Sequence, residues 1–206
     1  MKTFVKNAVA GLALSALFLV VISAPVRAQV LAGSGEVAGT IGYDHTSMTN
    51  NLGSPFNPTS HYFISGSGGY NVTPYITALG EYKFDPLIAP AGSAFKVHAQ
   101  LVGGAARFNF TPSNKIVPYA IVGVGYDRLN ASEPGLTQVA GGYYVNFGGG
   151  ASCYLGKNWG IRPEVRYERQ HVTYTPASEI LTANVVDVSG SIFYQWGGTG
   201  TAKKKK

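Results

Sequence analysis

The side chains best suited to catalysis or metal binding are few in this chain and lie far apart in the sequence. The four histidines are His45, His61, His98 and His171, and their spacing matches no metal-ligand motif. No phosphate-binding loop and no serine–histidine–aspartate pattern is present. The single cysteine, Cys153, cannot form a disulfide within the chain and is interpreted as a small apolar strand residue. These observations predict no cofactor, no bound metal and no catalytic group.

Ion pairing in a protein interior is the chemistry that the charged residues favour. In residues 161–168, with the sequence IRPEVRYE, apolar and charged side chains alternate strictly. A helix would spread the charges around its circumference, whereas a strand places all of them on one face. That face carries Arg162, Glu164, Arg166 and Glu168. Residues 76–84 alternate in the same way, with Glu81 and Lys83 on the polar face.

Eight segments with this two-residue period predict eight strands. We place them at residues 35–46, 60–72, 75–85, 94–110, 117–130, 138–155, 159–175 and 182–196. The fourth alternates less clearly, and a β-bulge at Gly103-Gly104 would shift its phase. Connections after the second, fourth and sixth strands are short, and the others are mostly longer, such as residues 47–59 with Pro55 and Pro58. This layout favours an all-β fold, an eight-stranded antiparallel transmembrane β-barrel with short periplasmic turns and longer extracellular loops.

The composition agrees with a surface that meets lipid. Charged residues make up 13% of the chain, against roughly 25% in globular proteins. Aromatic residues gather at the predicted strand ends around an aliphatic waist, as at the two interfaces of a bilayer. Near the short turns these are Tyr70, Tyr75, Phe108, Phe110, Tyr119, Tyr154, Trp159, Tyr194 and Trp196. Near the longer loops they are Tyr43, Tyr62, Tyr82, Phe84, Phe95, Tyr126, Tyr143 and Tyr167. A soluble barrel such as a lipocalin would instead keep its apolar residues inside.

The N-terminal segment predicts secretion. Lys2 and Lys6 precede an apolar stretch at residues 8–22, and Val26 and Ala28 form a small-residue cleavage site. We therefore divide the chain into a signal peptide at 1–28, a barrel at 29–196 and a Gly/Lys tail of unassigned role at 197–206. Without the signal and the four terminal lysines, nine basic residues face ten acidic ones. The folded part has no basic excess of the kind that nucleic-acid binding needs.

Several motifs resemble the small OmpA-like and OmpX-like outer-membrane β-barrel family. Residues 118–126, PYAIVGVGY, are similar to its fifth strand, and the motifs within residues 146–167 to its sixth and seventh. The last strand resembles its assembly signal, with Tyr194 and Trp196 as the paired aromatics, although Gly190 lies one place from the usual glycine. The resemblance covers about residues 33–196. It implies insertion by the barrel-assembly machinery, contact with outer-membrane lipid and lipopolysaccharide, and loops open to an extracellular ligand.

In such a barrel the polar faces point into the lumen, which the side chains of eight strands are just able to fill. The residues expected there are Glu36, Asp44, Glu81, Lys83, Lys96, His98, Asp127, Arg162, Glu164, Arg166, Glu168 and Asp187. Buried charges need partners, so we predict an ion-pair network, with Arg162 and Arg166 within reach of Asp187 and Glu36. The alternative is a narrow, porin-like channel through the same lumen.

An enzyme is a third class of function, and it follows from a partial resemblance to outer-membrane lipid A deacylases. These eight-stranded barrels carry His-x-Ser on a late strand and a glutamate downstream. Here His171 and Thr173 would take the first two positions and Glu179 the third. Threonine replaces the serine, and the usual residues after it are missing. The predicted function is therefore a structural or surface-interaction role, with the channel and the deacylase as alternatives.

Overall fold

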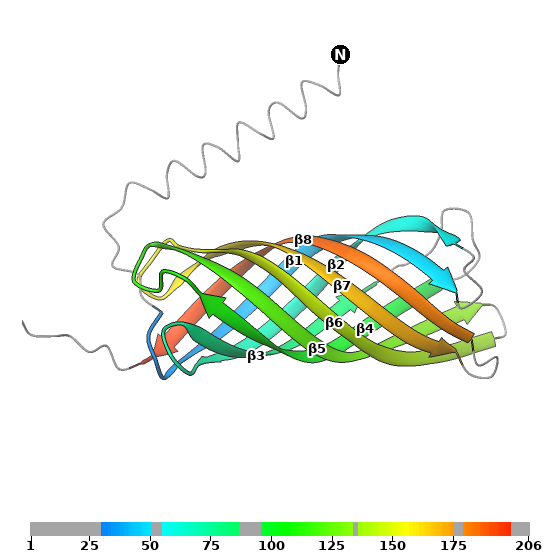
Figure 1. The fold of residues 1–206 in the computed structure, drawn as a ribbon, viewed down its shortest axis with the longest axis horizontal. Coiled ribbons are helices and arrows are strands. Elements are labelled where there is room, and N and C mark those ends of the chain that lie inside the picture. Colours follow the sequence, from blue (N-terminus) through cyan, green and yellow to red (C-terminus); the bar gives the residue numbers. More distant parts are fainter. Residues whose placement is uncertain (1–29, 51–54, 87–95, 134–135, 175–178, 199–206) are drawn as a thin grey trace, which may run out of the picture.

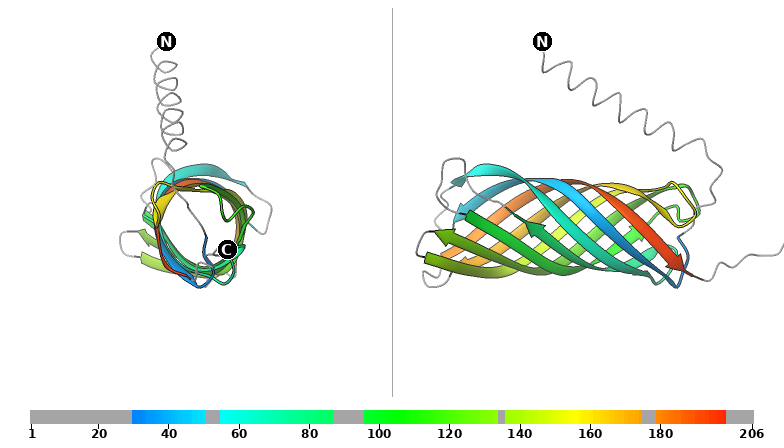
Figure 2. Two further views of the ribbon diagram at one scale, coloured as in Figure 1. Left: turned by 90° about the vertical axis from the view of Figure 1, so that its left-hand side faces the viewer. Right: turned by 180° about the vertical axis from the view of Figure 1, so that it is seen from behind.

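Eight strands close into one barrel in the computed structural model of the protein, which describes residues 30–50, 55–86, 96–133, 136–174 and 179–198. The strands are β1 (Ser34–Asn50), β2 (Pro55–Asn71), β3 (Ile76–Asp85), β4 (Lys96–Asn109), β5 (Ile116–Glu133), β6 (Leu136–Tyr154), β7 (Trp159–Tyr174) and β8 (Glu179–Gly197). Each pairs antiparallel with the next, and β8 pairs with β1. Figure 1 shows the tilted strands, and Figure 2 shows the closed ring down its axis. The predicted eight-stranded antiparallel barrel is confirmed.

The two ends of the barrel are distinct. The start of β1 and the end of β8 lie at one end, here called the terminal end, with the turns at 72–75, 110–115 and 155–158 (Figure 1). The opposite end, here called the loop end, carries the other four connections. Within the described residues, no helix is long and apolar enough to span a membrane.

The strands of the first hairpin reach further toward the loop end than the sequence predicted. β1 continues to Asn50 and β2 begins at Pro55, so the prediction of a loop was wrong for residues 47–50 and 55–59. Pro58 falls where the β1–β2 register shifts, between Thr46 and Met48 on β1. At such an irregularity a missing N–H costs no regular ladder bond, so proline does not end the strand.

The outer face of the barrel is mainly apolar. Tyr62 is 70% exposed and Ile192 is 66% exposed, and many other large apolar side chains are exposed beside them. So continuous an apolar exterior is what a lipid-facing surface requires. Two predicted members of the aromatic belts are corrected, because Tyr119 and Tyr154 point inward and are 3% and 2% exposed.

β4 has no β-bulge at Gly103-Gly104, contrary to the prediction. Its register with β3 and with β5 is unbroken through both glycines. The pattern looks weak because small residues replace large ones there. A Cβ on Gly103 would collide with the Tyr144 hydroxyl, so the glycine gives that inward ring its space. The inward face of β4 therefore keeps one phase from Ala99 to Arg107, both of which are buried.

Candidate functional site

The polar interior of the barrel is the candidate site. All eight acidic residues whose side chains the structure describes lie on inward faces: Glu36, Asp44, Glu81, Asp85, Asp127, Glu164, Glu168 and Asp187. Period-two alternation brings them there, since every second residue of a strand points to the same side. Their contacts divide into three clusters that follow one another from the terminal end to the loop end.

The Glu36 cluster lies nearest the terminal end. Arg107 donates two hydrogen bonds to the Glu36 carboxylate, of 2.7 and 2.6 Å, in a bidentate pair. Arg162 donates a third, of 3.1 Å, to Glu36 Oε1. Arg107 also donates to Thr77 at 3.2 Å, and Arg162 donates to Ser152 at 3.1 Å. One carboxylate thus holds two buried guanidinium groups, and hydroxyls accept part of their remaining N–H capacity.

The Arg166 cluster occupies the middle of the barrel. Arg166 donates two hydrogen bonds to Glu81, of 2.7 and 2.8 Å, and a third from its Nε to Glu164. The Tyr119 hydroxyl donates to the other oxygen of Glu164 at 2.6 Å. Bidentate arginine–carboxylate pairs are among the strongest and most directional polar contacts. The Arg166–Glu81 pair joins β7 to β3, which are opposite walls of an eight-stranded ring.

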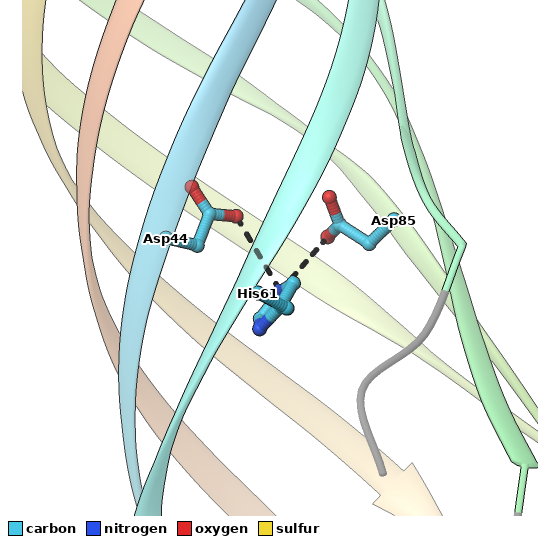
Figure 3. Close-up of side chains that lie close together, drawn as sticks. All are labelled: Asp44, His61 and Asp85. Carbon is cyan, nitrogen blue, oxygen red and sulfur yellow. Dashed lines mark ion pairs between the residues drawn. The ribbon is translucent and has the colours of Figure 1, made fainter.

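The Lys83 cluster lies toward the loop end. Lys83 Nζ contacts Asp44 Oδ2 at 2.7 Å and Asp187 Oδ2 at 3.1 Å. His61 Nε2 lies 3.6 Å from Asp44 Oδ2 and 3.8 Å from Asp85 Oδ2 (Figure 3). Glu168 accepts a hydrogen bond of 2.6 Å from Gln170.

The charge balance differs between the clusters. The first two contain three arginines and three glutamates, so their formal charges cancel. Toward the loop end, Lys83 is accompanied by five buried carboxylates, namely Asp44, Asp85, Asp127, Glu168 and Asp187. If all five are ionised, the negative excess there is four charges, since five carboxylates face one ammonium group.

Comparison with known proteins identifies the family. The outer membrane protein beta-barrel domain family matches residues 14–191. The chain belongs to this family. Neisserial surface protein A (NspA) has a TM-score of 0.63 and 15% identity, over 80% of this chain and 99% of its own. OprG from Pseudomonas aeruginosa has a TM-score of 0.51 and 10% identity, over 84% of this chain and 100% of its own. At these identities the likeness shows a shared fold alone, and no curated protein sequence matches the chain.

This outer-membrane barrel brings most of the residues predicted for the lumen into the three clusters. The structure places Glu36, Asp44, Glu81, Lys83, Asp127, Arg162, Glu164, Arg166, Glu168 and Asp187 on inward faces. Arg162 reaches Glu36, whereas Arg166 binds Glu81 and Glu164 and leaves Asp187 to Lys83.

His98 is a correction, because it lies on the outer face of the barrel. Its ring stacks on Phe84 at a centroid distance of 6.2 Å, and it shares the face of the exposed Val102. The bulge predicted at Gly103-Gly104 led to the residues before it, including His98, being assigned to the wrong face of β4. The side chain of Lys96 lies outside the described residues.

Among the acidic and basic residues of the clusters, the sequence reasoning missed Arg107, Asp85 and His61. Arg107 would have followed from an unbroken alternation along β4. Asp85 lies two residues after Lys83, on the same polar face as Glu81 and Lys83. It was missed because it is the last residue of the strand. His61 pairs in register with Asp44 across β1 and β2, and no spacing along the chain reveals that contact.

Two residues of the deacylase alternative, His171 and Thr173, lie on the outer face of β7. His171 lies beside Thr182, with its Nδ1 3.2 Å from the Thr182 hydroxyl, and packs on the Tyr143 ring. Thr173 is exposed. Glu179 stands opposite Tyr174 in the β7–β8 register, and its side chain lies outside the described residues.

The predicted assembly signal lies on the outer face at the terminal end. Tyr194 and Trp196 are exposed, and their rings stack at a centroid distance of 6.4 Å. Their role in assembly stays a prediction. The signal peptide at 1–28 and tail residues 199–206 lie outside the described residues.

Proposed function

We propose that this outer-membrane barrel is a closed, non-conducting scaffold whose loop end faces the cell exterior and carries interactions there. The ion pairs of the interior hold opposite walls together, and lipid and lipopolysaccharide surround the apolar outer face. The terminal end then faces the periplasm, where the barrel-assembly machinery would recognise Tyr194 and Trp196.

The Arg166–Glu81 pair is the observation that carries this proposal. It crosses the lumen between opposite strands, through two hydrogen bonds of 2.7 and 2.8 Å. Arg107–Glu36 and Lys83–Asp187 cross it at other levels, between β4 and β1 and between β3 and β8. The interior cavity between these contacts measures about 50 Å³, which is room for a few water molecules. A permeating solute would have to break buried, charge-assisted hydrogen bonds.

Liposome swelling tests the proposal against the porin-like alternative. Vesicles that contain the purified barrel should not swell in isotonic solutions of small neutral sugars. Swelling at rates that fall with solute size would establish a channel and contradict the closed scaffold.

The deacylase alternative has a separate test in lipid A. Expression of the barrel in a host outer membrane should leave the mass of lipid A unchanged. Loss of one acyl chain, abolished by His171→Ala, would contradict a purely structural role.

A further inference from the structure

Three side chains from neighbouring strands converge near the loop end of the barrel. Asp44 on β1 and His61 on β2 are direct register partners, and Asp85 is the last residue of β3. Figure 3 shows the imidazole between the two carboxylates. One possible ligand atom from each of the three residues lies within 4.8 Å of those of the other two. This arrangement is independent of whether the barrel conducts.

The contacts among these three groups are too long for hydrogen bonds. His61 Nε2 is 3.6 Å from Asp44 Oδ2 and 3.8 Å from Asp85 Oδ2, whereas N–H···O bonds measure about 2.7–3.2 Å. Four ligands placed tetrahedrally at about 2.0–2.2 Å from a zinc ion lie roughly 3.3–3.6 Å apart. The two distances from His61 Nε2 are therefore closer to the spacing of ligands around an ion than to the length of a hydrogen bond.

The same three side chains are buried, and each has a polar atom that lacks a hydrogen-bond partner within the described residues. Asp44, His61 and Asp85 are 1%, 8% and 2% exposed. Asp44 Oδ1, Asp85 Oδ1 and His61 Nδ1 have no hydrogen-bond partner in the described part of the chain. Such atoms are costly unless something compensates them.

The surroundings of the three residues carry an excess of negative charge, which a bound cation would reduce. Lys83 is accompanied by five buried carboxylates, and neither oxygen of Asp127 has a hydrogen-bond partner among the described residues. The arginines of the other clusters are already paired with Glu36, Glu81 and Glu164. A divalent ion would reduce the local excess from four negative charges to two.

We propose that Asp44, His61 and Asp85 bind a divalent transition-metal ion of the Zn²⁺ type, with water completing the coordination. One nitrogen and two carboxylate oxygens suit such ions, whereas Ca²⁺ and Mg²⁺ prefer oxygen ligands alone. Lys83 can stay in place, because a carboxylate oxygen can accept its hydrogen bond and still bind an ion. It would then orient Asp44 from behind the site, as partners of metal ligands commonly do.

Calorimetric titration with Zn²⁺ alone tests the site. Tag-free protein in detergent micelles, stripped with a chelator, should bind one Zn²⁺ per barrel and bind Ca²⁺ and Mg²⁺ far more weakly. Loss of a partner that only orients a ligand costs about 10–100-fold in affinity, so His61→Gln and Asp85→Asn should each cost at least about 100-fold. His45→Gln is the matched control, since His45 is exposed on the outer face one residue from Asp44. Binding that survives both ligand variants, or that is lost in the control, would overturn the proposal.

Urea unfolding of wild type and Asp85→Asn separates an ion from the rival explanation, that protons neutralise the carboxylates. Without metal, Asp85→Asn should fold and be at least as stable as wild type, because the substitution removes a negative charge that the neighbouring carboxylates repel. Saturating Zn²⁺ should raise the unfolding midpoint of wild type and leave that of Asp85→Asn nearly unchanged, since an ion stabilises only the state that binds it. A wild-type midpoint that does not respond to Zn²⁺ would overturn the proposal.

Discussion

Arg166→Met should be among the most destabilising single substitutions in the barrel. The guanidinium makes three hydrogen bonds, two to Glu81 and one to Glu164. Methionine keeps much of the length of the side chain but leaves Glu81 without its cation and Glu164 with only the Tyr119 hydroxyl. Breaking a buried ion pair costs about 3–5 kcal/mol. Because the Arg166 and Glu81 side chains are each 15% exposed, we expect about 3 kcal/mol, the lower end of that range.

Arg169→Met provides the matched control. Arg169 lies on the same strand but is exposed on the outer face. Its replacement should leave stability within about 0.5 kcal/mol of wild type or raise it. The double variant Arg166→Met, Glu81→Gln should recover at least about 1 kcal/mol of the loss, because it removes one of the unpaired charges.

Urea unfolding in detergent micelles measures these differences, with the midpoint and slope extrapolated to free energies. Trp159 and Trp196 are exposed on the outer face, so their fluorescence reports the loss of the apolar surroundings. If Arg166→Met and Arg169→Met unfold together within about 1 kcal/mol of wild type, the buried pairing of Arg166 is refuted.

Three further predictions concern processing, packing and assembly. N-terminal sequencing of membrane-extracted protein should begin at Gln29, and a start at Met1 would contradict the signal peptide. Gly142→Ala should cost about 1–3 kcal/mol in the same unfolding assay, because a Cβ would collide with the His171 carbonyl oxygen. A Cβ added at Gly190 would have no atom within 4 Å, so Gly190→Ala should leave the stability unchanged. Equal destabilisation by Gly142→Ala and Gly190→Ala would contradict this packing. Trp196→Ala should reduce the heat-modifiable, folded fraction in cell membranes, and an unchanged fraction would remove Trp196 from the assembly signal.

The strands with large, strictly alternating side chains could be predicted from the sequence. Residues 161–168 of β7 place four charges on one face and apolar residues on the other, so both the strand and its inward face follow from period two. β4 could not be predicted as well. Small residues around Gly103 weaken the alternation along β4. Because of the bulge inferred there, His98 was wrongly predicted to face inward and Arg107 was missed as an inward residue.

The contacts within the lumen lie beyond the reach of sequence patterns. Alternation shows that Arg162 and Arg166 face inward, but strand tilt and register decide which carboxylate each one meets. Arg166 crosses the barrel to Glu81 rather than reaching Asp187 on the neighbouring strand. His61, Asp44 and Asp85 come from three strands, so their convergence depends on how the strands pair and tilt and not on their spacing along the chain.

Conductance in planar bilayers tests the closed lumen most directly. The wild-type barrel should show no large, steady, salt-proportional current, because paired charges fill its interior. Arg162→Ala with Arg166→Ala breaks two of the three clusters and should increase openings. Arg128→Ala with Arg169→Ala changes the same net charge at two exposed outer positions and should stay silent. A stable open channel in the wild-type protein, or equal currents from both double variants, would contradict the account.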